Sequence, residues 1–168
     1  MEEAHGAPTL TGVTPTTAPA TAQAGLRPTR HLVDAGRRFS LWVFDVGLAC
    51  CAVEFLAATA GAASAPHGDV ARLGAVPTAA DAADADVLLV SGTVTAKLAP
   101  AVRALYDRLP GDKHVIAFGA CASSGGPYWD SYCVIPGVGT LLPVDVWVPG
   151  CPPRPEALLD ALRSLEQR

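Results

Sequence analysis

Apolar runs alternate with amphipathic stretches from about residue 39 to the end of the chain. Four short apolar runs predict buried strands: Ser40–Val46, Asp86–Val90, His114–Phe118 and Val144–Val148. Three other segments have the periodicity or the flanking residues of helices: about Cys51–Ala63, Pro100–Leu109 and Pro155–Gln167. In the second of these, Val102, Leu105 and Tyr106 share one face. Strands separated by helices indicate an α/β fold, with a parallel sheet covered by helices on both faces.

The first 30 residues follow a different pattern. They are rich in Ala, Thr and Pro and have no periodic apolar face that could be buried. Such a segment is expected to be disordered or to form a loosely attached tail. The pattern therefore predicts two parts: a tail over residues 1–30 and one α/β domain over residues 31–168.

Composition and charge narrow the range of partners. Half of the 168 residues are apolar and 17% are charged, which suits a domain with a sizeable core. The formal net charge is −4, so the electrostatic signature of nucleic-acid binding is not supported. The chain begins Met-Glu-Glu-Ala-His, which lacks the basic and apolar regions of a signal peptide. No apolar run reaches about 18 residues, so we expect a partner to hold the protein if it works at a membrane.

Four of the five cysteines follow predicted strands. Cys50 and Cys51 are adjacent and come after the first strand, Cys121 comes after the third, and Cys151 comes after the fourth. In an open parallel sheet, ligands bind beyond the carboxyl ends of the strands. We therefore expect these four thiols to meet in one crevice. Four thiolates suit a 4Fe–4S cluster or a closed zinc site.

The spacing of the four cysteines favours the cluster over zinc. Structural zinc sites take ligands in short pairs that are separated by about two to four residues. Here Cys50 and Cys51 have no residue between them, whereas Cys121 and Cys151 are far away along the chain. Two adjacent cysteines would strain a single tetrahedral ion, whereas a cubane offers each sulfur its own iron. A zinc-stabilised interaction module remains the alternative.

Three further features accompany this pattern. Cys133 follows no predicted strand, and we expect a buried, inert thiol there. Glu54 lies one helical turn after Cys51, where it could couple electron transfer to proton uptake or could be a helix-surface carboxylate. Gly125 and Gly126 would let the backbone approach a cofactor closely, or they form an ordinary turn.

Several motifs, in the same order along the chain, resemble a known family. From about His31 to the C-terminus, the chain is similar to the 20 kDa-type iron–sulfur subunit of proton-translocating NADH–quinone oxidoreductase, which is respiratory complex I. The adjacent cysteine pair is the specific part, because small subunits of nickel–iron hydrogenases have a spaced Cys-x-x-Cys in that loop. The motifs are Ser40-Leu41-Trp42, Gly47-Leu48-Ala49-Cys50-Cys51-Ala52-Val53-Glu54, Lys97-Leu98-Ala99-Pro100, Gly119-Ala120-Cys121-Ala122 and Val148-Pro149-Gly150-Cys151-Pro152-Pro153.

The resemblance implies a flavodoxin-like fold and one 4Fe–4S cluster held by Cys50, Cys51, Cys121 and Cys151. In that family the cluster is the last electron carrier before quinone, which binds at the interface with a hydrogenase-like large subunit. Further partners would be the other subunits of the peripheral and membrane arms, and the protein would lie at the cytoplasmic face of a bacterial membrane. The chain would be part of an oxidoreductase and would not be active alone. A small subunit of a membrane-bound, hydrogenase-related complex without quinone is the second possibility.

Overall fold

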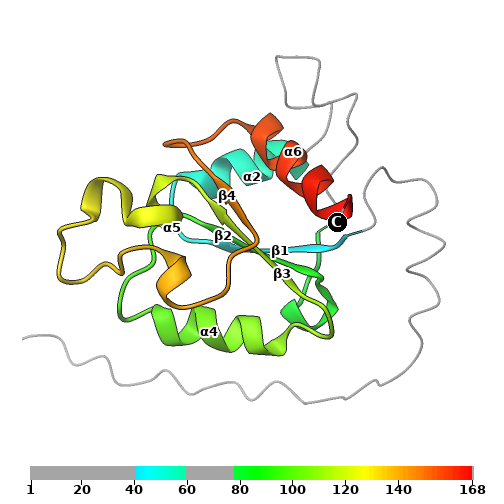
Figure 1. Cartoon of the computed structure of the whole chain (residues 1–168), viewed down its shortest axis with the longest axis horizontal. Coiled ribbons are helices and arrows are strands. Elements are labelled where there is room, and N and C mark those ends of the chain that lie inside the picture. The colour runs from blue at the N-terminus through cyan, green and yellow to red at the C-terminus, as the bar shows by residue number, and fades with distance from the viewer. Residues whose placement is uncertain (1–40, 60–77, 168) are drawn as a thin grey trace, which may run out of the picture.

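The fold is built on one parallel sheet of four strands. The computed structural model describes residues 41–59 and 78–167. The strands are β1 (Val43–Gly47), β2 (Val87–Ser91), β3 (His114–Phe118) and β4 (Val146–Val148), and they lie side by side in that order. Every residue of β2 is buried, as expected for a parallel strand that is covered on both faces. The predicted parallel sheet is therefore confirmed (Figure 1).

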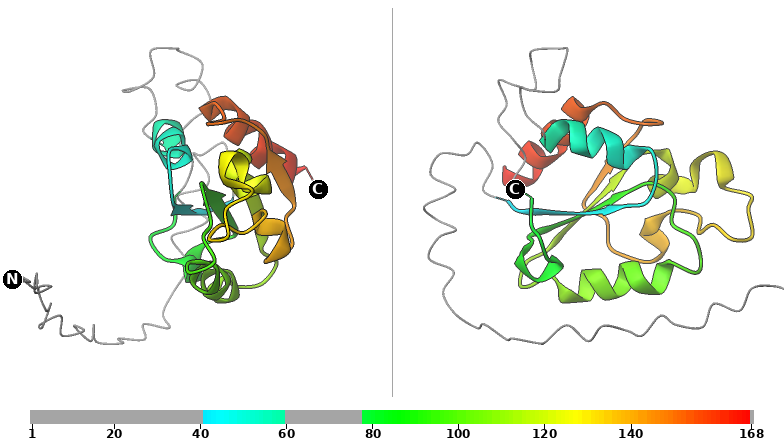
Figure 2. Two further views of the ribbon diagram at one scale, coloured as in Figure 1. Left: turned by 90° about the vertical axis from the view of Figure 1, so that its left-hand side faces the viewer. Right: turned by 180° about the vertical axis from the view of Figure 1, so that it is seen from behind.

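Helices cover the two faces of the sheet. Helices α2 (Cys51–Thr59) and α6 (Pro155–Glu166) pack on one face, and α4 (Ala99–Arg108) packs on the other (Figure 2). The short helix α5 (Ala120–Ser124) follows β3 directly. The remaining helical turns are η2 (Ala82–Asp84), η3 (Gly126–Tyr128) and η4 (Val138–Thr140).

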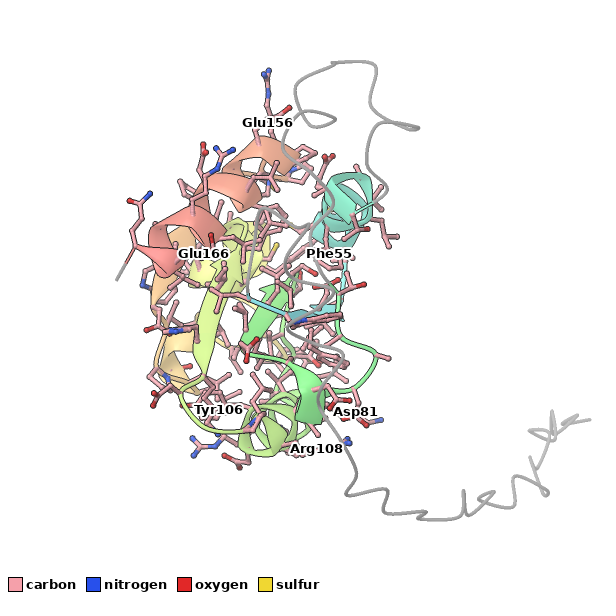
Figure 3. All side chains as sticks on the ribbon, turned by 90° about the vertical axis from the view of Figure 1, so that its right-hand side faces the viewer. Phe55, Asp81, Tyr106, Arg108, Glu156 and Glu166 are labelled. Atoms are coloured by element: carbon pink, nitrogen blue, oxygen red, sulfur yellow. The ribbon has the colours of Figure 1, made fainter. Side chains whose placement is uncertain are left out.

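Alternating side chains of the strands divide the core into two parts. Leu89 and Ile116 belong to the part beneath α2 and α6, whereas Leu88 and Val115 belong to the part beneath α4. Phe55 of α2 lies in the first part (Figure 3). Full burial of each such side chain contributes about 1.5–3 kcal/mol. Packing on both faces therefore fixes the position and the direction of the strands that lead to the cysteines.

A fifth extended segment identifies the topology. Val43 pairs with Val87 on one side and forms a parallel bridge with Thr78 on the other, where Ala79 N donates to Val43 O at 2.8 Å. If the segment at Thr78 is counted as the second strand along the chain, the spatial order is 2-1-3-4-5. This is the flavodoxin-like order, and it places the topological switch point between β1 and β2.

Two aspartates shorten the predicted strands at their amino ends. The first strand was expected from Ser40, which lies outside the described residues, but it begins at Val43, and the Asp86 carboxylate accepts a hydrogen bond from Trp42 N at 2.9 Å. Asp86 itself precedes β2, which ends one residue later than expected, at Ser91. The fourth strand was expected from Val144 but begins at Val146, because the Asp145 carboxylate accepts from Val115 N at 2.8 Å.

The helices agree closely with the pattern. Helix α4 begins one residue before Pro100, with Val102 buried and Leu105 and Tyr106 partly buried. Its last turn is tied to η2 by the ion pair between Arg108 and Asp81, whose Nη2 and Oδ1 atoms are 2.7 Å apart (Figure 3).

Some expectations lie beyond the described part of the chain. Residues 60–63 of the first predicted helix and the predicted tail over residues 1–30 are outside the described residues. Within the described ranges, no helix is long and apolar enough to cross a membrane.

Candidate metal centre

Three loops at the carboxyl edge of the sheet carry four thiols. Cys50 precedes α2 and Cys51 is its first residue, Cys121 lies in α5, and Cys151 lies between β4 and α6. Backbone hydrogen bonds join two of these loops, because Gly119 N donates to Val148 O at 2.9 Å and Ala120 N donates to Gly150 O at 2.8 Å. Backbone hydrogen bonds therefore tie the loop of Cys121 to the loop of Cys151.

The other three thiols are close enough to Cys51 to affect it electrostatically. Burial, together with the charges of Cys50, Cys121 and Cys151, raises the pKa of Cys51 to about 12. A raised pKa means that the thiolate form of Cys51 is disfavoured in the protein without a bound cation. A cation at this position would stabilise the thiolate. The fold thus brings the four cysteines that follow strands to one edge, and it places Cys51 within electrostatic range of the other three.

The four sulfurs differ in exposure. Cys51 and Cys121 are buried, whereas Cys50 and Cys151 are exposed. One side of the site therefore faces the core and the other faces outward. Among the described residues, no three His, Cys, Asp or Glu side chains lie close enough to hold one metal ion.

Two glycines allow backbone to lie directly against the thiols. Gly119 has φ +95°, and a Cβ atom there would lie 2.5 Å from Cys51 Sγ. Gly126 has φ +57°, and a Cβ atom there would lie 2.8 Å from Cys121 Sγ. The expected close approach at Gly125-Gly126 is therefore to a cysteine of the site. The role of Gly119 was not recognised from the sequence, although a glycine between a strand and a cysteine is a usable signal.

Cys133 is exposed, so the expectation of a buried thiol was wrong. The segment around it forms an antiparallel bridge through Val134 and Thr95, and Ala96 N donates to Cys133 O at 2.7 Å. Backbone pairing with a neighbouring loop, rather than a core beneath the side chain, fixes its position. Residue type alone could not reveal this.

Glu54 and the histidines are the other titratable candidates in the sequence. Glu54 is partly buried in the first turn of α2. His114 begins β3, at the edge of the sheet opposite the thiols, with Nδ1 3.8 Å from Asp145 Oδ1. His5, His31 and His67 lie outside the described residues.

One buried polar pair was missed at the sequence level. Ser91, at the end of β2, is fully buried and donates to Asp45 Oδ1 of β1 at 2.5 Å. Burial raises the pKa of Asp45 to about 6, although the hydrogen bond from Ser91 opposes that shift. Ser91 O also accepts from Leu48 N at 3.0 Å, so the pair lies beneath the loop that leads to Cys50. The available signal was an aspartate inside an otherwise apolar strand.

Fold and cysteine placement together define a class of protein: a flavodoxin-like α/β domain with four cysteines at the carboxyl ends of its parallel strands. The family model described as "NADH ubiquinone oxidoreductase, 20 Kd subunit" matches residues 49–165. The chain therefore belongs to this family, as the resemblance of its motifs indicated.

Individual relatives agree with this assignment. The chain is 55% identical over 141 residues to the B 1 subunit of NADH-quinone oxidoreductase in Salinispora tropica, an alignment that covers 84% of this chain and 72% of the relative. It is 51% identical over 132 residues to the B subunit of NADH-quinone oxidoreductase in Clostridium beijerinckii, an alignment that covers 79% of this chain and 75% of the relative.

A solved structure shares the fold. It is the membrane-bound sulfane sulfur reductase, an archaeal respiratory membrane complex. One chain of that complex matches with a TM-score of 0.65 and 32% identity, over 81% of this chain and 73% of the other.

Proposed function

We propose that this chain is the electron-transfer subunit of a proton-translocating NADH–quinone oxidoreductase, in which Cys50, Cys51, Cys121 and Cys151 hold one 4Fe–4S cluster. When bound, the cluster supplies a one-electron carrier that is the last in the chain before quinone. The observation that carries the proposal is that four cysteines follow three parallel strands at one edge of the sheet, with Cys51 within electrostatic range of the other three. Membership of the 20 Kd subunit family supports the same assignment.

The donor set fits such a cluster. Iron–sulfur clusters of this type take four cysteine thiolates. A cubane distributes its ligands over four iron atoms, so it asks for a wider spacing of sulfurs than a single ion does. The raised pKa of Cys51 has burial and three neighbouring thiols as its causes, and iron would offset both effects by compensating the negative charge.

Exposed apolar side chains support a large protein partner. Val53 and Leu56 of α2 are 65% and 61% exposed, and Trp129 and Tyr132 beyond η3 are also exposed. Large exposed apolar residues near a functional site are typical of protein interfaces. We infer that a hydrogenase-like large subunit covers this region and that quinone binds between the two. Other subunits would then hold the chain at the cytoplasmic face of a bacterial membrane.

Glu54 is assigned a supporting role. It lies one turn after Cys51 on α2, and it is partly buried. An electron added near a carboxylate disfavours its ionised form. We propose that Glu54 takes up a proton when the site is reduced.

A second candidate is the small subunit of a membrane-bound, hydrogenase-related complex without quinone. The fold shared with one chain of the archaeal sulfane sulfur reductase shows that this fold also occurs in a respiratory membrane complex of another name. The higher identity to NADH-quinone oxidoreductase subunits favours the first candidate. Purifying the intact complex and assaying quinone reduction would separate the two.

The ligand set can be tested with five variants of the full-length chain in its complex. Cys50→Ser, Cys51→Ser, Cys121→Ser and Cys151→Ser should each lose iron and the low-temperature EPR signal of the cluster. Cys133→Ser is the matched control and should retain both, because its side chain is exposed and lies on a different loop. Normal iron and a normal signal in any of the first four would remove that cysteine from the ligand set. Zinc in place of iron in the unaltered protein would support an interaction module instead.

A further inference from the structure

The turn after α5 folds back onto Cys121. Gly125 has φ +84° and ends α5, and its N–H donates to Cys121 O at 3.0 Å. Gly126 follows with φ +57°. Its bare Cα lies beside Cys121, where a Cβ atom would be 2.8 Å from Sγ, 3.0 Å from N and 3.1 Å from Cα. The 2.8 Å distance to Sγ is shorter than non-bonded contacts of Cβ atoms, and the other two distances are tighter than most such contacts, so a side chain at residue 126 would force Cys121 or the turn to shift.

Cys121 has little room to move away. It is buried, and its neighbour Ala122 is fully buried in the core. Ala120 N donates to Gly150 O at 2.8 Å, which ties the amino end of this short helix to the loop after β4, and the Ser123 hydroxyl donates to Gly119 O at 2.9 Å within the helix. A Cβ atom at residue 126 would therefore press on Cys121, and its closest contact would be with the sulfur. Close-packed interiors transmit such displacements rather than absorbing them.

We propose that Gly126 is a positioning residue for the Cys121 thiol: because it has no side chain, this sulfur can take its place beside the other three. The inference rests on the proposed function of the four cysteines as cluster ligands. It goes further because it assigns the placement of one ligand, Cys121, to Gly126, a residue that does not itself bind the cluster. Functional constellations must be held within about 0.5 Å of their working geometry, so a shifted sulfur should impair cluster loading.

A simpler explanation is that residue 126 must be glycine only because its φ is positive. The chain contains a control for this explanation. Gly111, in the loop between α4 and β3, has φ +55°, and a Cβ atom there would meet nothing within 4 Å. Gly111→Ala therefore carries about the same backbone cost as Gly126→Ala, without any contact. Asparagine tolerates this backbone conformation better than alanine but still has a Cβ atom.

The experiment compares Gly126→Ala, Gly126→Asn, Gly111→Ala and Gly111→Asn in the full-length chain within its complex. Iron content and EPR g-values report on the bound cluster. The alkylation rate of Cys121 in iron-depleted protein, followed by mass spectrometry with iodoacetamide, reports on the thiol itself. We expect both Gly126 variants to lose iron, to shift the EPR signal and to change the alkylation rate of Cys121, while both Gly111 variants match the unaltered protein.

Several results would overturn the proposal. Equal effects of the two alanine variants, or recovery in Gly126→Asn, would leave only the backbone explanation. If Gly126→Ala does not fold, folding should recover when Cys121→Ala removes the sulfur, and failure to recover would also overturn the proposal. Failure of the proposed function can be told apart from failure of the Gly126 proposal. In the first case the unaltered protein would lack iron, while the alkylation rates of Cys121 would still differ between the Gly126 and Gly111 variants.

Discussion

Replacing Asp45 by asparagine should make the protein more stable at neutral pH. Burial raises the pKa of Asp45 from 3.8 to about 6 in the folded protein, so ionising this carboxyl costs more there than in the unfolded chain. Because the folded state binds the proton more tightly, the contribution of Asp45 to the free energy of unfolding is highest below pH 3.8. It falls as the pH rises toward about 6. An asparagine at this position would have no charge to bury, yet its amide oxygen can still accept the hydrogen bond from Ser91.

The expected gain in the free energy of unfolding follows from the size of the pKa shift of Asp45. About two pKa units correspond to about 3 kcal/mol. The side chain is only partly buried, so screening by solvent should reduce the observed gain to about 1–2 kcal/mol. Asp45→Asn should therefore raise the free energy of unfolding by that amount at pH 7.5, and by progressively less as the pH falls toward 4.

Urea denaturation of the full-length chain, at intervals between pH 4 and pH 7.5, measures this difference directly. Asp112→Asn is the control, because it also removes one negative charge but from an exposed loop. The difference between Asp45→Asn and the unaltered chain should grow with pH up to about 6.5 and then level off. A difference that does not depend on pH, or a variant that is less stable at pH 7.5, would refute this account of Asp45.

Three other predictions concern the assembled site and its surroundings. Glu54→Gln should keep the cluster, but the midpoint potential of the cluster should decrease less with rising pH, because no carboxylate would remain to take up the proton. EPR-monitored redox titration measures this slope. An unchanged slope would make Glu54 a helix-surface carboxylate. Deleting residues 2–25 should leave iron loading unchanged, because the segment has neither ligands nor an apolar face, whereas a loss of iron would show that it belongs to the fold. The chain expressed without partners should self-associate in light scattering, because its mean hydropathy is +0.30 and Val53 and Leu56 are exposed; a stable monomer at high concentration would contradict an obligate interface.

The sequence alone determined the order and type of the elements and the positions of the four cysteines relative to the strands. Buried parallel strands appear as apolar runs because both faces are covered, so β3 was located to the residue and β2 was displaced by one. The carboxyl ends of parallel strands share one edge, so Cys121 and Cys151 could be brought near Cys50 without knowledge of the packing. These inferences need only local periodicity and one general rule of topology.

The tertiary structure decided whatever depends on contacts between distant residues. The bridge from Thr78 to Val43 reveals the flavodoxin-like strand order, and a single pair of residues leaves no periodic trace in the sequence. The contact of Gly126 with Cys121 depends on the path of a turn, and the burial of Asp45 depends on what packs over β1. The side chain of Cys133 is exposed, and the backbone around it pairs with residues 95 and 96, which are almost forty positions away. Local sequence carries propensity and chemical type, whereas exposure and close approach arise only when separate segments meet in space.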